Sequence, residues 1–367
     1  MSRHSVNVKS DSNNLLFVFS SRRTPRGRFT FQKLLKKFPA TTIFLNDYEN
    51  QWYTSDIVDG EYLSWHSLIS AYINNYSNGL SNIYFIGEGM GAHAALKFGA
   101  IFNAKRIIAF NPEVTLGMKG SRSHNDLKEL AAEHDLRTIA FPEETQSIII
   151  SNNGNFFDYY SASEIKHHHA NSKVYVLNNF KGDLLEQLRR DTDFQSLIFN
   201  MLLKGADAEL SSIPRGKLFN SRTVQLIYDA VYSGEYNRDE FVKTLERIVQ
   251  IAPDWAFTQH LYGLSLDESG FKTAALEHYT RSITLASYQG KSLIKLAEIL
   301  LSMKRYEEAL VHLEPFCRKN NSLKCEELLI QAYKELQLYD AARSEIVRFS
   351  ENVADKKNAQ KLLAMID

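Results

Sequence analysis

The period of the hydrophobic pattern changes once along the chain, near residue 220, and this change restricts the folds that are possible. Before it, short apolar runs rich in β-branched and aromatic residues alternate with helical patterns. The runs cover residues 15–20, 41–47, 82–87, 106–112, 147–151 and 173–179. They are apolar on both faces, which is typical of parallel strands covered by helices on both sides. The sequence therefore predicts a three-layer α/β domain with an open, mostly parallel sheet.

After residue 220 the pattern is helical throughout and repeats at intervals of about 33–34 residues. Blocks begin near residues 222, 256, 290 and 323, and Ala309 and Leu313 of one block match Ala342 and Ile346 of the next. This period, with its alternation of small and large residues, resembles the tetratricopeptide repeat. The resemblance implies a solenoid of about four helix pairs, closed by a capping helix at residues 355–367. A helical bundle without repeats is the alternative.

The resemblance also implies where a partner would bind. In tetratricopeptide solenoids the first helix of each pair lines a concave face that holds a peptide or another protein's helix. Positions between the packing residues of these first helices are therefore candidates for partner binding. They are Gln225, Gln259, Lys295, Glu298 and Gln331. The candidate face is polar and mixed in charge, which favours recognition by hydrogen bonds and ion pairs.

Composition argues against several classes of protein. Lys+Arg and Asp+Glu are equal at 43 each, so no overall field favours nucleic acid or an anionic membrane. The N-terminal residues lack the apolar segment of a secretory signal, and the apolar runs are too short to span a bilayer. Cys317 and Cys325 alone make neither a disulfide framework nor a zinc site. We expect a cytoplasmic protein without metal, cofactor or nucleic acid.

Residues 84–95 read YFIGEGMGAHAA, in which an apolar strand runs through alternate glycines into an alanine-rich helix. The spacing is that of the G-x-S-x-G nucleophile elbow, with Gly89 in the place of the serine. This stretch and the strand after it resemble the α/β-hydrolase fold. The segments NDYENQWY (46–53) and FNPE (110–113) are also similar to those of bacterial hydrolase-like proteins tied to surface-glycan modification and accessory secretion. The overall resemblance covers about residues 15–200.

The resemblance allows the catalytic triad to be assigned position by position. The nucleophile position is Gly89, which has no side chain to attack a carbonyl. The acid position is Asn155, with Asp158 three residues further on, and the histidine position is Gly182. Loss of nucleophile and base together removes the proton-transfer pair of a serine hydrolase. The sequence therefore favours an inactive hydrolase fold.

Other residues near the expected site remain candidates. Ser20 and Ser21 end the first strand, where hydrolases of this fold have an oxyanion-hole amide, and His93 lies in the first turn of the elbow helix. These two serines and His93, with Asp158, are the fallback catalytic residues. A ligand crevice at the ends of the strands is expected to be lined by Gly87, Gly89, Met90, Asp47, Trp52 and Tyr53.

Three further motifs have a second interpretation. GEGMGA (87–92) satisfies the dinucleotide fingerprint, but two strands precede it and the next strand ends in Asn111, with an acid only at Glu113. HHH (167–169) is interpreted as solvated surface, because adjacent helical side chains converge poorly on one metal ion. The four arginines of SSRRTPRGR (20–28) form either a solvated loop or a site for an acidic ligand or partner.

Together these patterns predict an α/β-hydrolase-like domain over residues 1–210, a linker at 211–221 and a tetratricopeptide-like domain over 222–367. The function they favour is a non-catalytic scaffold that binds another protein through its helical repeats. The resemblance suggests a setting in bacterial cell-surface polysaccharide or glycoprotein biosynthesis or export. The alternative is an active esterase or acyltransferase acting on glycans through a non-standard nucleophile.

Overall fold

The computed structural model describes residues 4–56, 63–76, 79–127, 135–178, 184–285, 289–353 and 356–366. By its internal contacts the chain divides into two compact units, Met1–Phe241 and Val242–Asp367. Each unit is described below by itself. No helix among the described residues is both long and apolar enough to cross a bilayer.

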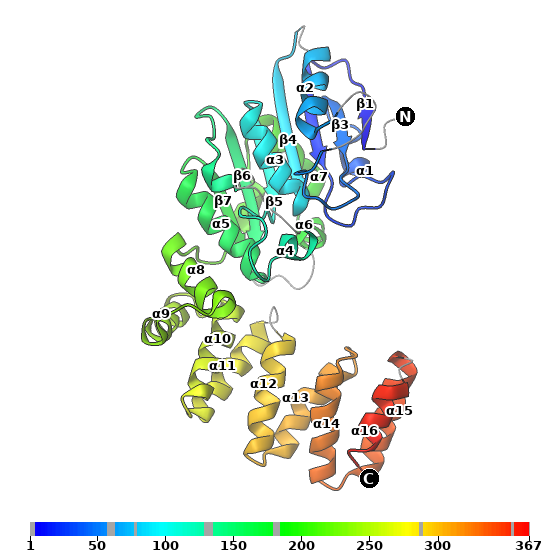
Figure 1. The fold of residues 1–367 in the computed structure, drawn as a ribbon, viewed down its shortest axis with the longest axis vertical. Coiled ribbons are helices and arrows are strands. Elements are labelled where there is room, and N and C mark those ends of the chain that lie inside the picture. Colours follow the sequence, from blue (N-terminus) through cyan, green and yellow to red (C-terminus); the bar gives the residue numbers. More distant parts are fainter. Residues whose placement is uncertain are drawn as a thin grey trace. The chain divides into compact units, whose positions relative to one another are not determined.

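The first unit is built on a seven-stranded sheet with strand order β1-β3-β2-β4-β5-β6-β7 (Figure 1). The strands are β1 (Ser5–Val8), β2 (Asn14–Phe19), β3 (Thr41–Leu45), β4 (Asn82–Glu88), β5 (Arg106–Phe110), β6 (Gln146–Asn152) and β7 (Lys173–Leu177). All neighbouring strands pair in parallel except β1 and β3, which are antiparallel. The six predicted strands are confirmed. Strand β1 was not predicted, because its sequence SVNV is a short edge strand without a continuous apolar run.

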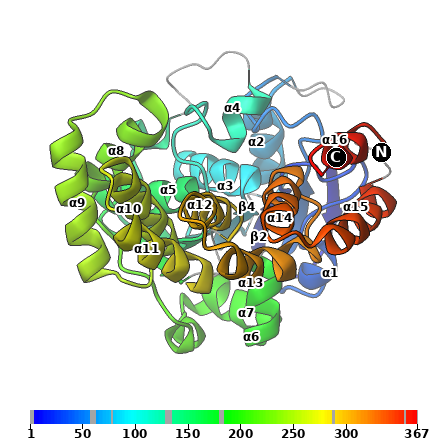
Figure 2. The ribbon, with the colours of Figure 1, turned by 90° about the horizontal axis from the view of Figure 1, so that it is seen from below.

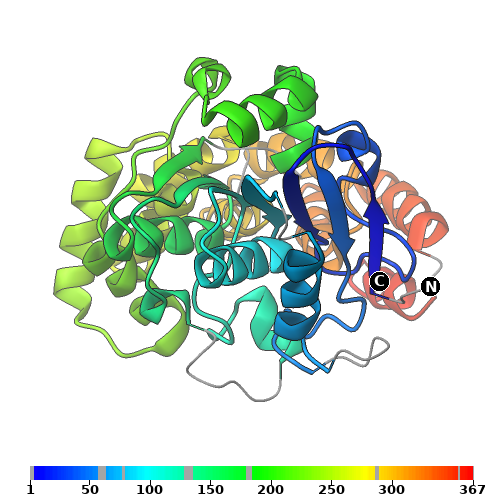
Figure 3. The ribbon, with the colours of Figure 1, turned by 90° about the horizontal axis from the view of Figure 1, so that it is seen from above.

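Helices cover both faces of this sheet, as Figure 3 shows. Helices α2 (Trp65–Asn75), α3 (Met90–Ile101) and α5 (Phe156–His168) contribute to one apolar layer, and α1 (Gln32–Leu35), α6 (Leu184–Asp191) and α7 (Phe194–Lys204) to the other. Along β2 the residues alternate between the two layers, with Phe17 and Phe19 in the first and Leu16 and Val18 in the second. This alternation explains why the strand is apolar on both faces.

Helix α8 (Ser221–Tyr228), followed by a π-helical turn at Asp229–Ser233, packs against α5 within the first unit. The hydroxyl of Tyr160 on α5 donates to Oε1 of Gln225 at 2.7 Å. The rings of Phe156 and Tyr232 stack with their centroids 5.6 Å apart. The unit boundary at Phe241 therefore lies beyond the linker predicted at 211–221, because aromatic packing joins the first helical block to the α/β domain.

The second unit contains α10 (Ala256–Glu268), α11 (Lys272–Leu285), α12 (Gln289–Ser302), α13 (Tyr306–Cys317), α14 (Leu323–Glu335), α15 (Tyr339–Val353) and α16 (Lys356–Leu363), which Figure 2 shows end-on. Helix α9 (Arg238–Ile251) runs across the unit boundary. From α10 onward each helix packs against the next, and α12 also contacts α10 and α14. The helix starts agree closely with the predicted blocks at 256, 290 and 323. A continuous solenoid stays a prediction.

The recurring positions of the repeat form the core of the second unit. Ala309 and Leu313 on α13 are fully buried in one apolar cluster with Ala342 and Ile346 on α15. A Cβ on Gly263 of α10 would lie 3.0 Å from the ring of Tyr279 on α11, so a small residue is needed where these helices cross. The sequence pattern of small and large residues thus reports real packing positions.

Truncation tests the boundary between the units. We expect residues 1–241 to form a stable, monodisperse protein and residues 1–210 to melt at a lower temperature or aggregate, because removing α8 uncovers Phe156 and Tyr160 on α5. Calorimetry and size-exclusion chromatography of both fragments measure this. Equal melting temperatures would show that α8 does not stabilise the α/β domain.

Candidate functional site

The predicted elbow joins β4 to α3 (Figure 1). Gly89 lies between them as the N-cap of α3. Gly89 has φ 54° and ψ −114°, in the left-handed half of backbone space that favours glycine. Its N–H donates to the carbonyl of Phe110 on β5 at 2.8 Å, and its carbonyl accepts from the N–H of His93 at 3.1 Å. The turn from strand to helix therefore has the sharp geometry expected of a nucleophile elbow.

The two glycines that flank the apex are required by close packing. A Cβ on Gly87 would lie 2.1 Å from the carbonyl oxygen of Gly91, and a Cβ on Gly91 would lie 2.3 Å from the carbonyl oxygen of Phe19. A Cβ on Gly89 would meet no atom of the described residues within 4 Å. The elbow thus has no room for a side chain at the two flanking positions, whereas its apex faces open space but carries no side chain.

The predicted acid position is occupied by a capping residue. Asn155 is the N-cap of α5, and its Oδ1 accepts from the N–H groups of Phe157 at 2.9 Å and Asp158 at 3.2 Å. Asp158 itself is buried and pairs with Arg122 at 2.8 Å. Gly182, the predicted histidine position, lies outside the described residues.

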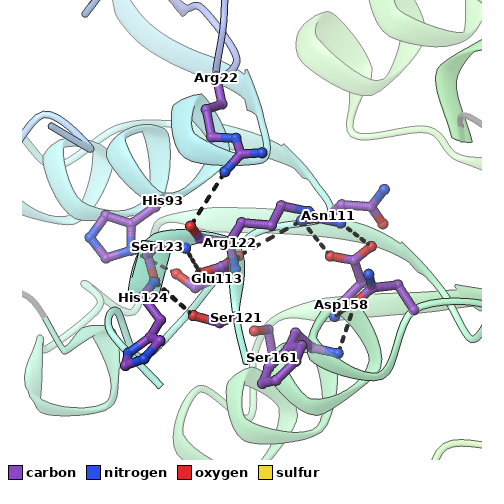
Figure 4. A network of polar contacts seen from close by, with 12 residues as sticks. Arg22, His93, Asn111, Glu113, Ser121, Arg122, Ser123, His124, Asp158 and Ser161 are labelled. Carbon is purple, nitrogen blue, oxygen red and sulfur yellow. Dashed lines mark hydrogen bonds and ion pairs between the residues drawn. The ribbon is translucent and has the colours of Figure 1, made fainter. Parts of the chain in front are cut away.

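Arg122 is the centre of a polar network at the carboxyl ends of the strands (Figure 4). It lies on the short helix α4 (Arg122–Asp126), and three acids influence it: Asp158 after β6, Glu113 after β5 and Glu88 at the end of β4. The carboxylate of Glu113 accepts from the backbone N–H groups of Arg122 at 3.0 Å and Ser123 at 3.1 Å. One guanidinium thus lies among three acids at the edge of the sheet where the elbow lies.

Burial raises the pKa of both Glu113 and Asp158, and Arg122 acts in the opposite direction on each. The pKa of Arg122 is raised in turn, first by Asp158 and then, after the opposing effect of burial, by Glu113 and Glu88. Asp158 therefore serves as the partner of a cation. Arg122 could not be predicted from the sequence, because its contact with Asp158 joins residues 36 positions apart and no motif marks it.

The serine candidates have structural partners. Ser20 is buried, and its Oγ accepts from the N–H of Thr30 at 3.1 Å. The N–H of Ser20 donates to the carbonyl of Leu45 at 2.9 Å, and that of Ser21 donates to Oγ1 of Thr30 at 3.0 Å. The amides that an oxyanion hole would use at this strand end are thus already engaged.

His93 points into the interior next to the elbow. Its ring is buried, and Nδ1 lies 2.7 Å from the backbone carbonyl of Glu113. Because a carbonyl can only accept, Nδ1 must carry the proton and donate to it. His93 therefore joins α3 to the segment after β5.

Most of the expected crevice residues are buried and make packing contacts, and their role in binding a ligand stays a prediction. Asp47, Trp52, Tyr53 and Met90 are all buried. The N–H of Tyr53 donates to Asp47 at 2.9 Å, and burial raises the pKa of Asp47. The indole N–H of Trp52 donates to Asp126 at 3.0 Å, which also pairs with Arg22 at 3.2 Å. These residues brace the loop after β3, and only Gly89 of the predicted set faces open space.

The partner-binding candidates divide into two groups. Gln225 is bonded to Tyr160 and Asp229 within the first unit, and Gln259 is buried between Pro253 and His278. These two are therefore removed from the candidate face, because their amides already have internal partners. Lys295, Glu298 and Gln331 remain at least partly exposed.

The remaining motifs have structural explanations. His169 is buried, with Nε2 3.0 Å from the carbonyl of Leu136, so the prediction that all three histidines are solvated is wrong for this one. Burial lowers its pKa. The structure offers no group of three or more His, Cys, Asp or Glu side chains that could hold a metal within its described part. Glu113, the acid that follows the strand after the dinucleotide-like turn, caps α4.

Substitutions at two elbow glycines test which of these positions must be glycine for steric reasons. We expect Gly89→Ser to fold with only a modest loss of stability, because a Cβ has room there despite the positive φ. Gly91→Ala should lower the melting temperature much more, because its methyl group would collide with the backbone of Phe19. Thermal unfolding of both variants checks this. A Gly89→Ser protein as unstable as Gly91→Ala would mean that the apex is sterically closed.

Comparison with known proteins gives fold-level similarity only. No protein-family model matches the sequence, and no curated protein sequence matches it. Among solved structures, the capsule O-acetyltransferase of Neisseria meningitidis serogroup A is 15% identical, with a TM-score of 0.39, over 52% of this chain and 89% of that chain. The glycosylation-associated Gap123 complex from Streptococcus agalactiae is 16% identical, with a TM-score of 0.41, over 55% of this chain and 44% of that chain.

A third similar structure is FphF, a fluorophosphonate-binding serine hydrolase of Staphylococcus aureus. It is 11% identical, with a TM-score of 0.32, over 46% of this chain and 76% of that chain. Because all three TM-scores lie below 0.5, we base the functional conclusions on this chain's own residues. The strand order, the helix layers and the elbow together give the first unit an α/β-hydrolase-like fold with glycine at the nucleophile position.

Proposed function

We propose that the α/β unit is a non-catalytic, pseudo-hydrolase scaffold and that the helical unit binds another protein. The observation that carries this proposal is the elbow itself. Its backbone and flanking glycines are retained, while the apex lacks the nucleophile for which that geometry exists. The sequence resemblance to hydrolase-like proteins of surface-glycan modification gives the setting, which is the assembly or export of cell-surface polysaccharide or glycoprotein.

The chemistry of ester hydrolysis supports the non-catalytic proposal. The reaction needs a nucleophile, a base that takes its proton and donors that stabilise the oxyanion. Here Gly89 supplies no nucleophile, and Asp158 is engaged by Arg122. The N–H of Ser21 is engaged by Thr30. A small anion or carbonyl compound can bind at the start of α3 without any reaction following.

The alternative, an esterase with a non-standard nucleophile, would have to use Ser20, Ser21 or His93. Ser20 is buried and accepts from a backbone amide, and Ser21 lies 3.3 Å from the hydroxyl of Thr30. His93 donates from Nδ1 to a backbone carbonyl. Since neither serine bonds to a base among the described residues, we favour the scaffold.

The helical unit supplies the binding surface in this proposal. Nζ of Lys295 lies 3.2 Å from Glu298, and Nζ of Lys324 lies 3.2 Å from the other oxygen of the same carboxylate. The pair of cations lowers the pKa of Glu298. These charges lie on α12 and α14, two first helices of the predicted repeat. A partner surface with alternating charges would match them.

An activity assay tests the scaffold proposal directly. We expect no hydrolysis of p-nitrophenyl acetate above the buffer rate, and no labelling by a fluorophosphonate probe, with the full chain or with Gly89→Ser. The added serine should stay inert, because a hydroxyl without a base has far too high a pKa to attack. Steady turnover that disappears on replacing Ser20, Ser21 or His93 would establish the esterase alternative instead.

The binding face is tested by three variants. We expect Lys295→Glu to weaken capture of the partner, more strongly at low salt, without changing the melting temperature. Lys319→Glu, in the exposed turn after α13, is the matched charge control and should bind as wild type. Leu296→Ala, at a position that is 1% exposed, should instead lower stability by roughly 2–4 kcal/mol. If Lys295→Glu and Leu296→Ala lost stability equally and partner capture stayed unchanged, the assignment of position 295 to the binding face and position 296 to the core would be wrong.

A further inference from the structure

A second concave site lies in the α/β unit, in the helix layer opposite the elbow helix. The pocket has a volume of about 570 Å³, within the range of about 300–1,000 Å³ typical of small-molecule sites. Its walls include Arg28, Phe29, Phe31, Lys33, Arg189 and Gln195. Phe31 belongs to the apolar layer of α6 and α7, whereas α3 of the elbow belongs to the other layer. The pocket is therefore independent of the hydrolase-like site.

The chain is locally basic here although its overall charge is zero. Residues 21–46 hold 7 Lys and Arg but neither Asp nor Glu. Two arginines of this segment have local partners, since Arg22 pairs with Asp126 and Arg26 lies 5.3 Å over the ring of Tyr48. Arg28 is the arginine of the SSRRTPRGR motif that lines the pocket.

Three exposed cations line the pocket, two from the segment around α1 and one from α6. Arg28 precedes α1, Lys33 lies on α1 and Arg189 lies on α6. Within the ranges that the structure describes, none of the three forms an ion pair, and neither Asp nor Glu lines the pocket. Three positive charges that line one pocket attract an anionic ligand.

The walls of the pocket are braced before any ligand binds. The guanidinium carbon of Arg189 lies 5.5 Å over the ring of Phe194, a buried residue at the start of α7. The side-chain amide of Gln195 donates to the backbone carbonyl of Leu34 at 2.9 Å, which ties α7 to α1. Such bracing reduces the side-chain entropy that binding must overcome.

We propose that this pocket binds a small phosphorylated ligand of the nucleoside diphosphate class. Arginine guanidinium groups suit phosphate because they donate two parallel hydrogen bonds to its oxygens, and Lys33 adds a third point charge. Phe29 is half-buried, packs against the core beside Phe44 and lines the pocket, so the exposed part of its ring is the surface on which a base would stack. A ligand with both a diphosphate and a ring fits this combination of charge and aromatic surface.

Calorimetric titration of the full chain with ADP, inorganic pyrophosphate, adenosine and sulfate tests the proposal. We expect ADP to bind more tightly than pyrophosphate. Adenosine and sulfate should bind only weakly, and the affinity for ADP should fall as the salt concentration is raised. Arg189→Gln and Lys33→Gln should each weaken ADP binding by about tenfold or more, the loss typical of one charge-assisted hydrogen bond.

Arg190→Gln is the matched control, because Arg190 is the next residue on α6, donates to Gln187 and does not line the pocket. It should bind ADP as wild type, and all three variants should keep the wild-type melting temperature. Equal weakening by Arg190→Gln would reduce the site to a non-specific basic surface and overturn the proposal. Equal affinity for pyrophosphate and ADP, or no binding of either, would also overturn it.

Discussion

The first unit depends on how closely β4, the elbow and α3 approach the end of β2. Gly91 places its Cα against the carbonyl of Phe19, and Gly87 lies under the backbone of Gly91, with no space for a methyl group at either position. This contact sets α3 directly on the sheet, where its alanines join the rings of Phe19 and Phe85 in one core. A chain that keeps two glycines for packing and a third at the apex preserves the frame of a hydrolase site without its nucleophile.

The polar groups around that frame stabilise the fold. In an acyl-transfer site of this fold, the strand ends would supply a nucleophile, an imidazole oriented by a carboxylate, and two amides that bind the oxyanion. Here Glu113 caps α4, Asp158 holds Arg122, and Asn155 caps α5. Burial raises the pKa of each carboxyl group, and the Arg122 guanidinium opposes that rise at both. A network of charged side chains therefore lies at the same edge of the sheet as the elbow.

Sequence periodicity predicted most of the fold, because burial determines both the spacing of apolar residues and the packing of helices and strands. Six strands, the elbow and the starts of α10, α12 and α14 were predicted within a few residues, since apolar spacing records which faces are covered. The glycine at the elbow apex could also be identified from the sequence, because the flanking glycines Gly87 and Gly91 mark residue 89 as the apex position. Polar candidates were predicted less well. Trp52, Tyr53 and Gln259 looked available in the sequence, yet each is buried with internal hydrogen-bond partners.

The sequence by itself thus determined the order of elements, the glycine apex and the packing positions of the helical repeat. Only the tertiary structure decided which polar side chains meet. Arg122 reaches Asp158 across 36 positions, Trp52 reaches Asp126 across 74, and Gln225 bonds to Tyr160 across 65. The pocket of Arg28, Lys33 and Arg189 likewise joins distant segments. Hydrophobic burial follows a local period that a sequence displays, whereas a polar contact depends on where loops and helix ends come together in space.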